Sequence, residues 1–149
     1  MYFVWLTDEQ QGIWRAYLAM SGRLQAALSR QLLQDHGLSL ADYDVLVALG
    51  ERPDCRMTDL GAHLGWEQSR VSHQLARMRA RGLIERSGAA DDRRAAVVSL
   101  TDAGRAALAA AAPGHAELVR TVVFEGMSPA QAAELRQWTA TVLDRLGPS

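Results

Sequence analysis

Residues 60–82, LGAHLGWEQSRVSHQLARMRARG, predict two helices joined by a tight turn. The first helix is short, from about residue 57 to 64, with Thr58 as its expected N-cap and Gly65 as the turn residue. The second runs from about residue 67 to 80, because apolar residues recur there at intervals of three and four. Its expected buried stripe consists of Val71, Leu75 and Met78. A short helix, a glycine turn and a second helix with a polar outer face form a helix-turn-helix.

The second helix of this pair carries many polar and basic side chains on its outer faces. Arg70 can donate two hydrogen bonds to guanine, and Gln68 can pair with adenine in the major groove. Arg77 lies further along the helix and is better placed for a phosphate. The side chains that we predict to contact DNA from this helix are Gln68, Ser69, Arg70, Ser72, His73 and Arg77.

Charge is distributed unevenly along the chain, which has a formal net charge of −1. Residues 52–105 hold ten arginines against seven acidic residues, whereas the remainder holds six arginines against ten. A basic middle between acidic flanks is typical of a protein with one surface that attracts phosphates. Two interpretations stay open for Arg79, Arg81 and Arg86: they contact DNA, or they point to solvent or pair with Glu85.

Two short strands should follow the helix pair, because the apolar period falls from 3.6 to about two. They cover about residues 82–88 and 94–101, and the segment SGAADDRR, residues 87–94, forms a long charged loop between them. Arg93 and Arg94 in this loop suit the minor groove, since a guanidinium tolerates desolvation in a narrow negative slot. The pattern therefore predicts a wing that contacts DNA.

Amphipathic helices flank this unit on both sides. We expect helices from Asp8 to about Asp35, from about Leu40 to Leu49, and from Asp102 to about Glu125 with a kink at Pro113. A last helix should begin at Ser128 and Pro129. These helices carry more apolar surface than a small winged core can cover, and a second copy of the chain can cover it. The residues concerned include Trp5, Leu6, Trp14, Tyr17, Leu18, Val119, Val122, Val123 and Trp138.

The segment from residue 59 to 104 resembles the MarR family of bacterial winged helix-turn-helix regulators. The shared features are L-x-x-x-L-G before the second helix of the pair, RGLIER at the entry to the first strand, D-x-R at Asp92 and Arg94, and LT-x-x-G at Leu100, Thr101 and Gly104. In this order and spacing they are fairly specific. The flanking helices extend the resemblance over nearly the whole chain.

The fold that this resemblance implies is mainly α with a small two-stranded β-hairpin wing, a winged helix-turn-helix with N- and C-terminal dimerisation helices. The chain would be a single domain, residues 1–149, with the winged part at about 40–101 and the dimerisation helices at about 1–36 and 102–149. It would act as a homodimeric transcription regulator, a repressor that binds a palindromic operator in double-stranded DNA. Arg94 would lie at the wing tip and Asp92 would orient it. Many family members release DNA when a small molecule binds, so an effector of unknown identity is a further expected partner.

Composition argues against several other classes of protein. Cys55 is the only cysteine, so no internal disulfide can form. No apolar run approaches the roughly 20 residues that span a bilayer, and the opening MYFVWL lacks the basic region of a signal peptide. These features favour a cytoplasmic protein. We find no P-loop, HExxH or nucleophile-elbow motif. We therefore expect that the protein is not an enzyme and that it binds no cofactor.

Three alternatives remain beside the DNA-binding regulator. Cys55 could make it redox-responsive, although only Arg52 and Arg56 lie near enough in sequence to lower a thiol pKa, which favours an inert thiol. A metal-responsive regulator is disfavoured because the four histidines lack the short spacing of metal ligands. A winged helix used only for protein contacts is disfavoured by the arginines of the second helix.

Two locations stay open for a group of aromatic and histidine side chains: the wall of an effector pocket, or the core and dimer interface. These residues are Trp14, Tyr17, His36 and His115.

Overall fold

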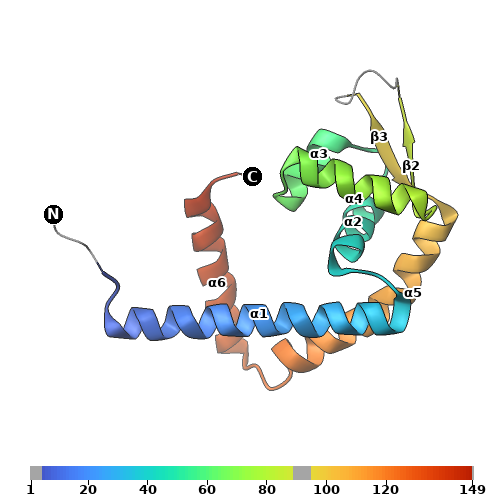
Figure 1. Ribbon diagram of the computed structural model, residues 1–149. Helices are drawn as coiled ribbons and strands as arrows, with labels where there is room; N and C mark the ends of the chain where they lie inside the picture. The colour runs from blue at the N-terminus through green and yellow to red at the C-terminus, as the bar shows by residue number, and fades with distance from the viewer. Residues whose placement is uncertain (1–4, 89–94, 149) are drawn as a thin grey trace.

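A computed structural model describes residues 5–88 and 95–148 of the chain. In these residues the elements are α1 (Asp8–His36), α2 (Leu40–Glu51), β1 (Cys55–Arg56), α3 (Met57–Leu64), α4 (Gln68–Ala80), β2 (Ile84–Ser87), β3 (Val97–Leu100), α5 (Asp102–Val119), the π-helix η1 (Arg120–Phe124) and α6 (Pro129–Leu146). The long helix α1 carries a unit made of α2, α3, α4 and the sheet at its C-terminal end, and α6 stands apart from this unit (Figure 1). The predicted class, mainly α with a small winged sheet, is confirmed.

The hydrophobic core lies mainly inside the unit formed by α2, α3, α4 and the sheet, and Leu32 of α1 and Ala111 of α5 complete it. Its fully buried side chains include Val45, Leu46, Leu60, Met78 and Val98. The predicted stripe of the second helix is buried as expected, and it packs α4 onto the elements beneath it. Because one face of α4 is fixed in the core, the opposite face is turned to solvent.

The sheet has three strands where the sequence predicted two. Its order is β1-β3-β2, and both neighbouring pairs are antiparallel. The additional strand β1 contributes only Cys55 and Arg56, opposite Val98 and Val97. Two residues are too few to show an alternating pattern in the sequence. Since β1 leads directly into α3, Arg56 is the N-cap of that helix, and the prediction of Thr58 is wrong.

Caps set the ends of the long helices. Thr7 and Ser128 form capping boxes at the starts of α1 and α6, and Gly37 ends α1 in a left-handed conformation with φ of 64°. Helix α5 continues through Pro113 and changes to π geometry only at η1. The predicted extents of these helices are thus close to those observed.

Candidate nucleic-acid interface

The two helices of the helix-turn-helix approach each other closely at a glycine. Gly65 ends α3 with φ of 66°, and Trp66 donates its backbone N–H to Gly61 O at 3.0 Å. A Cβ on Gly61 would lie 2.3 Å from Gln68 Nε2 and 3.3 Å from Val71 Cγ2. A side chain at position 61 would therefore displace the Gln68 amide and crowd the turn, so the glycine lets α3 and α4 approach closely here.

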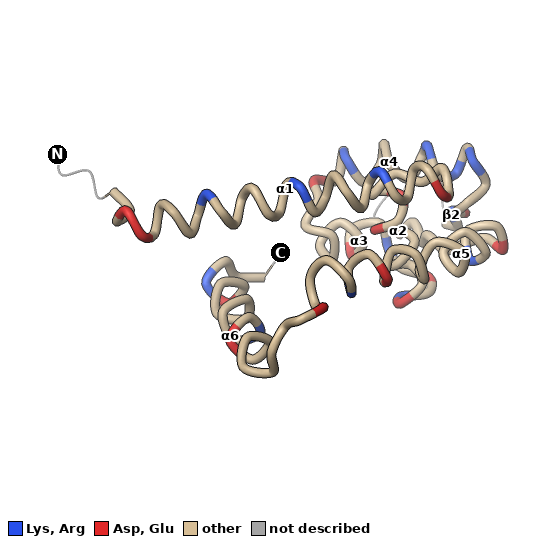
Figure 2. Tube along the Cα trace, turned by 90° about the horizontal axis from the view of Figure 1, so that it is seen from below, with Lys and Arg blue, Asp and Glu red and all other residues tan. Residues whose placement is uncertain are grey.

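The predicted contact residues of α4 are spread over three of its faces. Ser69 and His73 are exposed on the face opposite the buried stripe, at 100° per residue. Ser72 lies on the flank toward the sheet, where it lines a hollow together with Ile84 and Val98. Gln68 lies at the N-terminal end beside Gly61, whereas Arg70 and Arg77 lie on the flank toward α2. Figure 2 shows basic residues recurring along α4 and just beyond its C-terminal end.

Arg70 is held by an aromatic ring. Its guanidinium carbon lies 4.0 Å from the centroid of the Trp66 ring, in the turn between α3 and α4. This is a cation–π contact, which restricts the side chain without using any of its hydrogen-bond donors. Arg70 therefore keeps all five N–H groups for a partner. The sequence pattern did not indicate this contact, because Trp66 reads as a turn residue.

A buried polar network ties α4 to α2. Among the described residues, Asp42 and Gln74 are the buried polar side chains. Asp42 accepts hydrogen bonds from Gln74 Nε2 and from Arg81 Nη1, both at 2.6 Å, and Arg77 Nη2 donates to Gln74 Oε1 at 2.6 Å. The pairing of Arg81 with Glu85 is wrong, because the guanidinium of Arg81 pairs with Asp42, and its contact with DNA stays a prediction. Glu85 instead accepts from Ser99 Oγ at 3.5 Å.

The wing lies partly outside the described residues. Asp92, Arg93 and Arg94 all belong to that segment, so their roles stay predictions. Strands β2 and β3 bring the two ends of the loop together, since a Cβ on Gly88 would lie 3.1 Å from Ala95 O. The paired strands also lie beside α4, so the loop starts and ends on the same side of the molecule as the helix-turn-helix (Figure 1).

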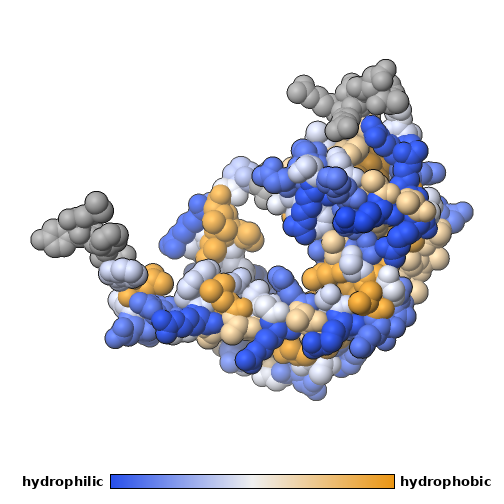
Figure 3. Space-filling view, in the orientation of Figure 1, coloured by the Kyte–Doolittle hydropathy of each residue, from blue (hydrophilic) through white to orange (hydrophobic). Residues whose placement is uncertain are grey.

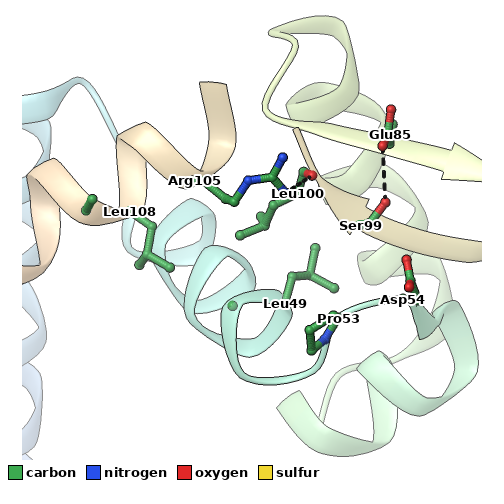
Figure 4. A pocket seen from close by; sticks show the side chains of 10 residues that line it. Leu49, Pro53, Asp54, Glu85, Ser99, Leu100, Arg105 and Leu108 are labelled. Carbon is green, nitrogen blue, oxygen red and sulfur yellow. Dashed lines mark hydrogen bonds between the residues drawn. The ribbon is translucent and has the colours of Figure 1, made fainter. Parts of the chain in front are cut away.

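A cavity with a volume of about 540 Å³ lies between α2, α5 and the sheet (Figure 4). Leu49, Pro53 and Leu108 provide apolar walls. Its one cation, Arg105, already donates to Leu100 O at 2.9 Å and to the Asp102 carboxylate. The cavity therefore offers little free charge to an anionic ligand.

A second cavity, of about 330 Å³, lies between α2, α3 and α5. Its wall includes Tyr43 and His115, whose rings stack with centroids 4.3 Å apart, together with Asp44 and His63. Burial lowers the pKa of His115, and the nearby Asp44 carboxylate opposes this shift. Of the four residues considered for an effector pocket, only His115 lines it. Trp14 and Tyr17 stack on each other elsewhere, and His36 is exposed at the end of α1.

Replacing Asp44 with asparagine should raise the free energy of unfolding at pH 7. Burial raises the pKa of the Asp44 carboxyl above its ordinary 3.8, and His115 and Arg70 oppose this only in part. The folded state thus binds the proton more tightly than the unfolded state, so stability falls as pH rises through the raised pKa. Urea denaturation should show the gain at pH 7 and its disappearance below about pH 3, where both states of the wild type are protonated. A variant less stable than wild type at pH 7 would contradict this assignment.

Cys55 is a buried thiol. Burial raises its pKa, Asp59 raises it further, and Arg52 opposes the shift. A thiol with a raised pKa is a poor nucleophile at neutral pH, in agreement with the inert thiol that we favoured. Within the described ranges, no group of three or more His, Cys, Asp or Glu residues is arranged to hold a metal ion. None of the described helices is long and apolar enough to span a bilayer.

Comparison with known proteins adds to this geometry. Residues 36–95 match the sequence model of the MarR family. Sco3205, a MarR family transcriptional regulator from Streptomyces coelicolor solved in complex with DNA, is 37% identical, with 99% of this chain and 94% of that chain covered and a TM-score of 0.91. AbsC, a MarR family transcriptional regulator from the same organism, is 33% identical, with 97% and 98% covered and a TM-score of 0.88. CouR from Rhodococcus jostii, solved with p-coumaroyl-CoA, shares the fold at 22% identity, with 87% and 90% covered and a TM-score of 0.75. No curated protein sequence gives a significant match.

Proposed function

Because this chain belongs to the MarR family of transcriptional regulators, we propose that it is a repressor that binds a palindromic operator as a homodimer. Membership of the family makes it a DNA-binding regulator and not an enzyme. The observation that carries the proposal is the placement of α4. Its apolar stripe is fixed in the core, and its opposite face presents exposed polar side chains. A single helix of this kind fits the major groove.

We assign the contacts according to the faces of α4. Ser69 and His73 face outward and would meet base edges, with Ser72 beside them on the flank toward the sheet and Gln68 at the N-terminal end of α4 beside Gly61. Arg70 would read a guanine. Two further groups complete the proposed interface: Arg77 would contact a phosphate, and Arg93 and Arg94, with Asp92 as the orienting residue, would enter the minor groove.

The dimer is supported by the location of the exposed apolar side chains. Every large exposed hydrophobic residue of the described ranges lies within residues 5–33 or 122–146, and none lies in the winged part. Helix α6 has no buried residue, and α1 has only Leu28 and Leu32. Apolar surface is visible on α6 and along α1 in Figure 3. Helices with so little burial need a partner surface, and we propose that residues 1–36 and 102–149 provide it within a single domain.

Selection of bound sequences from a random DNA pool tests this function. We expect a palindromic site whose half-sites lie about 34–36 Å apart, or a multiple of that distance. Affinity should fall with salt with a log–log slope of about −0.9 per neutralised phosphate. An absence of any enriched sequence, or binding insensitive to salt, would refute the proposal.

We propose that a small molecule releases the operator by occupying the cavity lined by Tyr43 and His115. This cavity adjoins α3, and its Asp44 carboxylate is close enough to Arg70 of α4 for the two charges to interact. A ligand there could therefore alter the arginine that we expect to read a base. Uncharged phenolic compounds titrated into the DNA complex should release DNA, and Val47→Trp, which fills the cavity, should block this release. Release that persists in that variant would place the effector elsewhere.

Replacing Arg70 with alanine should cost about 1–3 kcal/mol of binding free energy on the selected operator. The loss should be smaller on sequences that already differ at one base pair, because the variant no longer discriminates there. Anisotropy titrations against operators substituted at each position would identify that base pair. An equal loss on every sequence would instead assign Arg70 to the DNA backbone.

A further inference from the structure

Asp42 occupies a fixed place at the start of α2. It is the third residue of the helix, where its Oδ2 accepts from the backbone N–H of Ser39 at 2.9 Å in a capping box. Burial alone would raise the pKa of this carboxyl, but the hydrogen bonds from Arg81, Ser39 and Gln74 outweigh it and hold the pKa below its ordinary 3.8. A negative charge at a helix N-terminus is further stabilised by the helix dipole. Asp42 is therefore a charged, immobile acceptor beneath α4.

Gln74 connects this carboxylate to the surface of α4. Its side chain is buried, with 3% of its surface exposed, and both ends of the amide are used. The carboxylate of Asp42 can only accept and the guanidinium of Arg77 can only donate. The amide therefore has one orientation that satisfies both, with Nε2 toward Asp42 and Oε1 toward Arg77. The negative charge of Asp42 also polarises the amide and strengthens its oxygen as an acceptor.

The amide oxygen of Gln74 accepts a hydrogen bond from an exposed arginine. A residue that only anchored α4 to α2 would not need this bond. A buried amide is costly unless both its ends are bonded, and an apolar side chain of similar volume would pack α4 onto α2 without that cost. Among the described residues, the partner of Gln74 Oε1 is Arg77. The bond uses one of the five donors of Arg77 and leaves four for another partner.

We infer that Gln74 is a positioning residue for DNA binding: it holds the guanidinium of Arg77 on the α2 flank of α4, ready to meet a phosphate. This inference rests on the proposed contact between Arg77 and DNA. An arginine ordered before binding loses less side-chain freedom when the complex forms. Removal of the amide should then weaken binding even though Gln74 itself is buried and touches no DNA.

A double-mutant cycle tests this role. Gln74→Met should weaken operator binding by about threefold to tenfold, the cost of ordering one long side chain. Arg77→Ala should weaken it by about tenfold or more and lower the magnitude of the salt slope by about 0.9. Adding Gln74→Met to Arg77→Ala should cost less than about twofold more, since the group that Gln74 positions is already gone. Full additivity of the two losses, or no loss from Gln74→Met alone, would overturn the inference.

Arg79 provides the matched control, because it is an exposed arginine of α4 that lies on the flank toward the sheet. The double variant Gln74→Met with Arg79→Ala should lose operator affinity by the product of the two single losses. Nitrogen relaxation of the arginine side chains in DNA-free wild type provides a second readout, independent of the folding of any variant: Arg77 should be more ordered than Arg79. Equal mobility of the two would overturn the inference. If wild type itself bound no DNA while Arg77 was ordered, the proposed function would be refuted, but the ordering of Arg77 by Gln74 would still be supported.

Discussion

Replacing Trp138 with aspartate should leave the protein monomeric and weaken operator binding by at least about a hundredfold. Trp138 is 49% exposed in the single chain, and its ring packs edge-on against Tyr17, with centroids 5.7 Å apart. The two residues join α6 to α1 within the apolar surface that we assign to the dimer. A carboxylate there would have to be desolvated without a partner, which opposes association. A monomer has one winged module and loses the avidity of two linked half-site contacts, about 10²- to 10⁴-fold.

Sedimentation equilibrium and anisotropy titration on the selected operator would measure both effects. Gln137→Asp is the matched control, because it introduces the same residue at the neighbouring position of α6, on the face opposite the apolar stripe. The control should stay dimeric and bind DNA as wild type does. Thermal unfolding should change little in Trp138→Asp beyond the loss of the interface, since the buried core lies around α2, α3, α4 and the sheet. A Trp138→Asp protein that is dimeric and binds normally would remove α6 from the proposed interface.

The elements of the winged unit could be predicted because their signals are local. A period of 3.6 in α4 placed Val71, Leu75 and Met78 on one face, and all three are buried. Glycines marked the turns on either side of that helix, where Gly65 and Gly82 adopt positive φ angles of 66° and 73°. Such signals report which face of an element is apolar and where the element ends. The order of the helices and the outward face of α4 could therefore be predicted from these signals.

Contacts between distant segments were not predictable in the same way. The pairing of Asp42 with Arg81 joins residues 39 positions apart, and it depends on where α2 and α4 cross. Nothing in either local pattern distinguishes Asp42 from a solvated acid at a helix start. Local sequence likewise left Arg81 to DNA, to solvent or to Glu85, which is only four residues away. The faces of the candidate site could thus be predicted, whereas the orientation of its arginines required the structure.

One motif of the resemblance has a structural explanation that the sequence could not supply. In LT-x-x-G, Thr101 caps α5 by accepting from the backbone N–H of Gly104 at 3.0 Å. Its hydroxyl donates to Gly82 O at 2.5 Å, and its backbone N–H donates to Leu83 O at 3.1 Å. These bonds fasten the start of α5 to the corner between α4 and β2. The motif therefore connects the winged unit to the helix that leads into the proposed dimer interface.

Gly104→Ala should lower the free energy of unfolding by about 1–3 kcal/mol or more. A Cβ at this position would lie 2.0 Å from Leu83 O and 3.0 Å from Leu83 C, so backbone would have to move on one side of the junction. The shift would also disturb the bond from Thr101 to the same carbonyl. Gly22→Ala is the control, because Gly22 is helical with nothing within 4 Å of the added Cβ and should gain up to about 1 kcal/mol. Urea denaturation should therefore show changes of opposite sign in the free energy of unfolding of the two variants. If both variants were stabilised, α5 would not approach Leu83 this closely. The link between the dimer helices and α4 would then be looser than we infer.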